Sequence, residues 1–152
     1  MMRNIEIPEL KFNNWKVWDD RESIKNCDFP GVYLIAISDE NLRGKRIRWK
    51  HVSYIGMTNS VSGLKGRWNQ FQNSIKGNRG HSGGNKIFSK LRHYEQWHNK
   101  LYVSAMPIIC NVKTPSPNDQ LKMGWVTFLE YEAFSKYNSS ISNRTRPPFN
   151  TK

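Results

Sequence analysis

The sequence predicts an α+β fold in which a central antiparallel sheet of about three strands is flanked by helices. Three short apolar stretches have the length and composition of strands, at residues 32–37, 51–56 and 101–110. Over residues 64–75 and 85–98 the apolar residues recur every three to four positions, the period of a helix laid on a sheet, and residues 120–137 are expected to form a third helix. We therefore expect helices to cover the sheet formed by the three strands.

The length of 152 residues is enough for one hydrophobic core, and the chain has no internal repeat. We expect a single domain at residues 30–152, with an N-terminal extension at residues 1–29 packed on it. Trp15 and Trp18 lie three residues apart within the extension, and we expect their rings to attach it to the domain. The alternative is that these rings stack on a nucleic-acid base.

The chain is strongly basic, with 24 Lys and Arg against 12 Asp and Glu and a formal net charge of +12. A field of this sign attracts polyanions, with nucleic acid first and an anionic membrane surface second. There is no run of about 18 apolar residues and no apolar stretch typical of a signal peptide at the start, so we expect no membrane span and a cytoplasmic location. Cys27 and Cys110 are expected to be buried thiols in a reducing compartment.

The first two strands each carry a tyrosine. Residues 32–37 are almost continuously apolar, which is typical of a strand buried on both faces. Alternation places Tyr33 on the opposite face of the strand from Val32 and Leu34. Residues 51–56 are expected to form the second central strand, with Tyr54 and Gly56 on one face. A glycine at a strand end indicates a place where a side chain would intrude on a site.

The connection between these strands is the densest basic cluster of the chain. Gly44 is expected to supply a hairpin turn, and the cations around it, here named the basic loop cluster, are Lys45, Arg46, Arg48 and Lys50. Such a cluster is either solvated or in contact with phosphate, and both interpretations stay open. Because a hairpin connection ends beside the strands that it joins, we expect these cations to flank any cleft at the strand ends.

The helix that starts near residue 64 carries Arg67 about 70° from the centre of its apolar stripe. From this margin an arginine can keep its stem in apolar surroundings and direct its guanidinium into an adjacent cleft. Lys65 and Arg79 are further candidates for phosphate contacts. His81 follows in a glycine-rich loop that lacks the spacing of a nucleotide-binding loop, and it is either a site residue or an exposed loop histidine.

The C-terminal third is predicted from less regular patterns. Pro107 indicates that residues 101–110 form an edge strand. The helix at residues 120–137 is apolar nearly all round, which predicts a position in the core. It carries Glu130 and Glu132.

The two glutamates differ in their sequence neighbours. Glu132 has Lys136 four residues on, which is typical of a surface ion pair. Glu130 has Phe134 at that spacing, and a carboxylate among apolar groups is costly unless an ionic or hydrogen-bonding partner meets it. Glu130 is therefore expected either to pair with an arginine or to bind a metal.

Five elements follow one another along the chain: a GVY strand, a YIG strand, an arginine on the next helix, a glutamate on a later helix and an asparagine near the end. In the order of these elements, over roughly residues 30–150, the chain resembles the GIY-YIG nuclease family. The resemblance implies a divalent-metal-dependent endonuclease of restriction or phage type that hydrolyses DNA phosphodiester bonds. It also implies Mg²⁺ as the cofactor, for which Mn²⁺ can substitute.

The resemblance implies a role for each matched residue. Tyr33 or Tyr54 orients or deprotonates the attacking water. Arg67 holds the scissile phosphate, and the metal ligand is Glu130, with Glu132 as the alternative. Asn150, in the stretch PPFN, supports the site through hydrogen bonds.

The chain departs from the family pattern at one position and leaves its partners partly open. Family members often carry His or Tyr four residues after the arginine, where this chain has Phe71, and His81 is the expected substitute. The expected partner is double-stranded DNA, and a chain this short needs its specificity from its own loops or from homo-oligomerisation. The alternative function is a non-catalytic nucleic-acid-binding module on the same fold.

Overall fold

The computed structural model describes residues 6–78, 80–141 and 145–150. Within these ranges four antiparallel strands form one sheet in the order β1-β4-β2-β3. They are β1 (Lys16–Val17), β2 (Gly31–Ile37), β3 (Tyr54–Thr58) and β4 (Leu101–Pro107). The predicted α+β class with an antiparallel sheet is confirmed, whereas the predicted count of three strands is one too few. The additional strand is β1, which pairs with Val103 and Tyr102 of β4.

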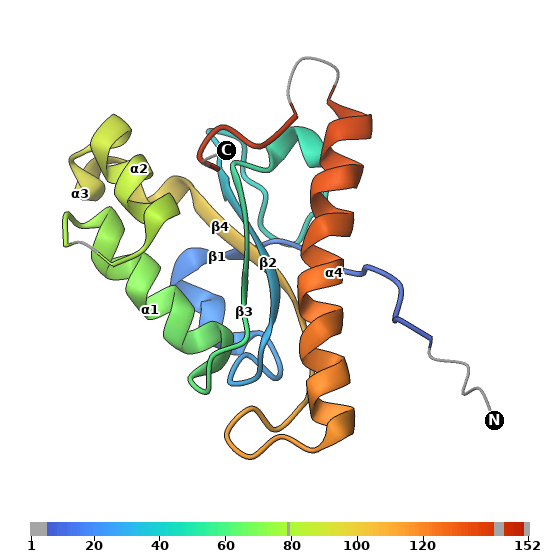
Figure 1. Ribbon diagram of the computed structural model, residues 1–152. Helices are drawn as coiled ribbons and strands as arrows, with labels where there is room; N and C mark the ends of the chain where they lie inside the picture. The colour runs from blue at the N-terminus through green and yellow to red at the C-terminus, as the bar shows by residue number, and fades with distance from the viewer. Residues whose placement is uncertain (1–5, 79, 142–144, 151–152) are drawn as a thin grey trace.

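Helices cover both faces of the sheet, so that three layers are visible in Figure 1. One face carries α1 (Gly63–Ile75), α2 (Ser82–Leu91) and α3 (Tyr94–Trp97), and the other carries α4 (Pro117–Ser140). Short 3₁₀ helices lie in the connections: η1 (Trp18–Ser23), η2 (Trp49–His51) and η3 (His98–Lys100). In the described part of the chain no helix is long and apolar enough to cross a membrane.

Alternation along β2 divides the core into two halves. Tyr33 and Ile35 pack on the α1 side, whereas Leu34 and Ala36 pack on the α4 side. All four side chains are fully buried. The strand is therefore buried on both faces, as its continuous apolar sequence predicts.

The two tryptophans of the N-terminal segment belong to this core. Trp15 packs on the α4 side and Trp18 on the α1 side, and each side chain is only 1% exposed. The Trp18 ring lies 5.1 Å from that of Phe71. Neither tryptophan has a ring face open to a nucleic-acid base, so the alternative of base stacking at these positions is excluded.

Two of the predicted elements differ in the structure. β4 lies between β1 and β2, not at an edge, and Pro107 is tolerated because it is the last residue of the strand. The helix α4 is not buried all round, since Phe128 is 40% exposed and Tyr131 is 65% exposed. Only one stripe of α4 packs on the sheet, formed by Val126, Leu129, Ala133 and Tyr137.

Candidate active site

Two tyrosines from neighbouring strands lie together on the α1 side of the sheet. Tyr33 of β2 pairs in register with Gly56 of β3, and the rings of Tyr33 and Tyr54 are 6.1 Å apart. A Cβ atom at Gly56 would lie 2.5 Å from the Tyr33 hydroxyl, so this hydroxyl lies directly over the glycine. Gly56 therefore provides the space that its place at the strand end predicts, although β3 continues two residues further, to Thr58.

His81 is fully buried against these rings, and the interpretation as an exposed loop histidine is wrong. It caps the N-terminus of α2, where its Nδ1 accepts a hydrogen bond from the Gly84 backbone N–H at 3.1 Å. Its own backbone N–H donates to Ser74 Oγ at 2.8 Å. Its Nε2 lies 2.7 Å from the Tyr33 hydroxyl. Because Nδ1 is an acceptor, a neutral His81 carries its proton on Nε2 and donates it to the Tyr33 oxygen.

Burial sets the protonation states of these groups. Desolvation, together with the positive charge of Arg67, lowers the pKa of His81 to about 3, so the ring is neutral at neutral pH. Desolvation also raises the pKa of Tyr33 well above its ordinary value, with Tyr54 adding to the rise and Arg67 opposing it. The pKa of Tyr54 is likewise raised, mainly by burial. Both phenols are therefore protonated at neutral pH.

Arg67 is the cation shared by these three side chains. It lies on α1, and its Nη1 donates to the Gln70 Oε1 at 2.7 Å. Its positive charge acts to lower the pKa of each of the three groups, and in the two tyrosines it opposes the larger rise that burial causes. For Tyr33 a side-chain hydrogen bond with Arg67 adds to this lowering. The marginal position on the helix predicts this orientation toward the cleft.

Glu130 approaches the same place from the other layer. It lies on α4, which packs beside β3 at the edge of the sheet, and its negative charge acts to raise the pKa of Tyr54, so the carboxylate is within electrostatic range of this phenol. Burial raises the pKa of Glu130 itself, and the charge of Arg146 opposes this rise. Glu132 lies about 200° further round the helix and so points elsewhere.

Asn150 supports the strand that carries Tyr54. Its side-chain amide pairs with the backbone of Ile55, accepting from the N–H at 2.9 Å and donating to the carbonyl at 2.8 Å. The backbone N–H of Phe149 donates to the Ser53 carbonyl at 3.0 Å. The C-terminal segment thus closes the open edge of β3 on both sides of Tyr54, which makes Asn150 a positioning residue.

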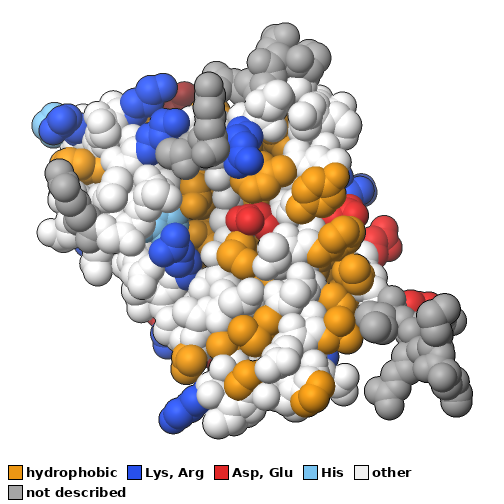
Figure 2. All heavy atoms as spheres, viewed as in Figure 1, with side chains coloured by type: hydrophobic (Ala, Val, Ile, Leu, Met, Phe, Trp, Pro, Cys, Tyr) orange, Lys and Arg blue, Asp and Glu red, His pale blue; other side chains and the backbone are white. Residues whose placement is uncertain are grey.

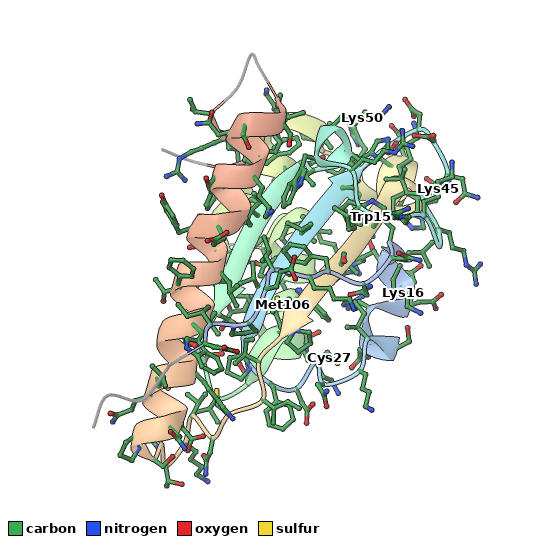
Figure 3. All side chains as sticks on the ribbon, turned by 90° about the vertical axis from the view of Figure 1, so that its right-hand side faces the viewer. Trp15, Lys16, Cys27, Lys45, Lys50 and Met106 are labelled. Carbon is green, nitrogen blue, oxygen red and sulfur yellow. The ribbon has the colours of Figure 1, made fainter. Side chains whose placement is uncertain are left out.

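The basic loop cluster does not lie as a group beside the tyrosines. The carbonyl of Lys45 accepts a hydrogen bond from the Trp15 N–H at 2.9 Å, and its Nζ lies 3.3 Å from Glu40. Figure 3 shows Lys45 near Trp15 and Lys16, at the β1 edge of the sheet, while Lys50 lies on η2. The expectation that this cluster flanks the cleft is wrong for Lys45, because the connection folds back across the α4 side of the sheet.

Of the two other predicted phosphate contacts, only Lys65 belongs to the described part of the chain. Lys65 Nζ forms an ion pair with Glu22 at 2.9 Å on the surface of α1. Arg79 lies outside the described residues. Figure 2 shows the face at the β3 edge, where acidic and hydrophobic side chains follow α4 and basic side chains lie toward α1 and α2.

The donor set near Tyr54 fits a hard divalent cation with few protein ligands. Among the described residues no three Asp, Glu, His or Cys side chains gather as a metal-binding group. Mg²⁺ usually takes one or two carboxylates and completes its shell with water and substrate phosphates. The half-buried Glu130, whose pKa is raised by burial, suits this coordination, because a bound cation stabilises its charged form.

Two features of this site are not evident from the sequence. Ser74 and Gly84 hold His81 in place, and Arg146 lies near Glu130. The only sequence signal for Arg146 is its membership of a basic tail.

Comparison of the chain with protein-family models, with curated proteins and with solved structures finds no match in any of the three.

Proposed function

We propose that this protein is a divalent-metal-dependent DNA endonuclease of GIY-YIG type, with a restriction-type or phage-type role. The observation that carries the proposal is the hydrogen bond between Tyr33 and His81, formed beside a cationic Arg67 and next to Tyr54, on which the charge of Glu130 acts. Hydrolysis of a phosphodiester needs an oriented water, positive charge on the phosphate and usually a divalent cation. These side chains supply a group for each need.

Arg67 and Glu130 are assigned to the phosphate and the cation. The guanidinium of Arg67 binds the scissile phosphate, because its planar fork of N–H donors matches two phosphate oxygens at once. Glu130 would hold Mg²⁺ or Mn²⁺. When bound there, the cation supplies Lewis-acid stabilisation of the charge that develops on the phosphate.

The tyrosine pair is assigned to the attacking water, with Tyr54, which is 7% exposed, at the cleft and the fully buried Tyr33 behind it. The Tyr33 oxygen accepts the Nε2–H of His81, which leaves its own O–H as a donor to a neighbouring group. Because burial raises the pKa of both phenols, either becomes a base only when nearby positive charge offsets the desolvation. His81 cannot take this proton, since its pKa is about 3 and its Nε2 already carries a hydrogen. It is therefore a donor that stabilises negative charge on the Tyr33 oxygen.

A second candidate is a non-catalytic nucleic-acid-binding module on the same fold. It is favoured by the net charge of +12, which attracts nucleic acid whether or not the site cuts. Incubation with long duplex DNA, with Mg²⁺ or with a chelator, followed by sequencing of the ends, separates the two. The nuclease assignment predicts metal-dependent cutting, whereas tight binding without cutting would establish the binding module.

A further inference from the structure

We propose that a groove beside Glu130 binds one unstacked base of the DNA substrate, next to the scissile phosphate; this inference rests on the proposed function. The groove lies between the C-terminal half of α4 and residues 145–146 and has a volume of about 490 Å³. Its walls include Tyr131, Phe134, Asn138, Thr145 and Arg146. The volume lies within the range of about 300–1,000 Å³ that is usual for small-molecule sites.

The walls of the groove are those of a base-binding site. Tyr131 is 65% exposed, and its ring lies 6.1 Å from that of Phe128. The guanidinium of Arg146 lies 4.6 Å from the Phe134 ring, so the groove also contains a cation and a second aromatic ring, which lies about one turn from Tyr131 on the same helix. Exposed aromatic rings combined with arginine are the usual means of holding a base and its phosphate. The side chains of Asn138 and Thr145 add donors and acceptors for a base edge.

The groove adjoins the candidate active site. Tyr131 directly follows Glu130 on α4, about 100° further round the helix. Arg146, at the other wall, lies over the Phe134 ring, and Phe134 is one helical turn beyond Glu130 on α4. A nucleotide in the groove would therefore neighbour the phosphate that Arg67 and Glu130 address.

The chemistry of stacking limits the class of substrate. In a paired duplex both faces of every base are covered by neighbouring bases, so a protein ring can stack only on a base that has left the stack. Leaving the stack costs least where the base is already unpaired. The groove therefore predicts a preference for DNA with an unpaired nucleotide at the cut, such as an overhang, a gap or a bubble.

A binding assay with 2-aminopurine tests this inference. The probe is a short duplex with one unpaired 2-aminopurine, titrated in the presence of a chelator so that no cutting occurs, and a fully paired duplex is the reference. We expect wild type to bind the unpaired probe more tightly and to change its fluorescence. Tyr131→Ala should weaken binding of this probe by roughly 5- to 150-fold while leaving the paired duplex unaffected. Tyr131→Phe should retain the preference, and Leu121→Ala, at another exposed apolar residue of α4 outside the groove, is the control.

Two results would overturn the inference: equal affinity of wild type for both duplexes, or equal effects of Tyr131→Ala and Leu121→Ala. A parallel cleavage assay with Mg²⁺ reports on the proposed function separately. Cutting without any specific effect of Tyr131 would remove the groove and leave the nuclease. Binding that depends on Tyr131, without cutting, would leave the groove and remove the nuclease.

Discussion

Replacing Gly56 by alanine tests whether the Tyr33 ring lies across β3. The added Cβ would stand 2.5 Å from the Tyr33 hydroxyl and still closer to the ring, which is fully buried and held at its hydroxyl by His81. The ring cannot move away without breaking this hydrogen bond, so the strain stays in the core. Overpacking of this kind costs about 1–3 kcal/mol of the free energy of unfolding. For a chain of this size, each kcal/mol lowers the melting temperature by about 2–4 °C.

Thermal and urea unfolding of Gly56→Ala and wild type measure this cost. Gly124→Ala is the matched control, because a Cβ at this helical position meets nothing within 4 Å. Alanine is a better helix former than glycine, so the control should gain up to about 1 kcal/mol. If Gly56→Ala proved as stable as wild type, the ring would not lie over the strand, and the hydrogen bond between Tyr33 and His81 would have no geometric basis.

Three further predictions concern titration, the strand edge and binding. The pKa of His81 falls from 6.5 in the unfolded chain to about 3 in the folded one, so its contribution to stability is present above pH 6.5 and is lost as the pH falls toward 3. The free energy of unfolding of His81→Gln should therefore depend less on pH across this range than that of wild type. An unaltered pH dependence would contradict the burial of the ring. Asn150→Ala removes two hydrogen bonds to Ile55 and should lower the free energy of chemical unfolding by about 1–3 kcal/mol. Asn138→Ala is the control away from the sheet edge, and equal stability of the two variants would refute the edge-closing role of Asn150. Arg46→Ala with Arg48→Ala should lower the log-log salt slope of DNA binding by about 0.9 for each phosphate that these side chains neutralise, and an unchanged slope would mean that the basic loop cluster is merely solvated.

The strand that carries Tyr33 could be predicted well from local pattern. Alternation with a period of two is a property of the extended backbone, so the sequence alone places Tyr33 and Ile35 on one face and Leu34 on the other. The exposure of Phe128 was not predictable, because an all-round apolar pattern does not indicate which stripe meets the sheet.

The remaining differences depend on interactions between distant residues. His81 is buried because its backbone N–H reaches Ser74 and its ring reaches Tyr33, and no local pattern encodes either interaction. The path of the basic loop cluster depends on the backbone pairing of Lys45 with Trp15. Strand order has the same origin, since the central position of β4 requires the two-residue strand β1 outside it.

Single-turnover cleavage by Glu130→Gln, measured together with DNA affinity, tests the central claim most directly. The substitution keeps the size of the side chain and removes the charge that would hold the metal. Cleavage with Mg²⁺ should fall roughly 100-fold or more, because charge stabilisation by a metal is worth several kcal/mol. Affinity should stay unchanged or rise slightly, because the basic field supplies most of the binding. Glu132→Gln, the matched control on the same helix, should cut like wild type; cutting by Glu130→Gln at the wild-type rate would contradict the assigned site.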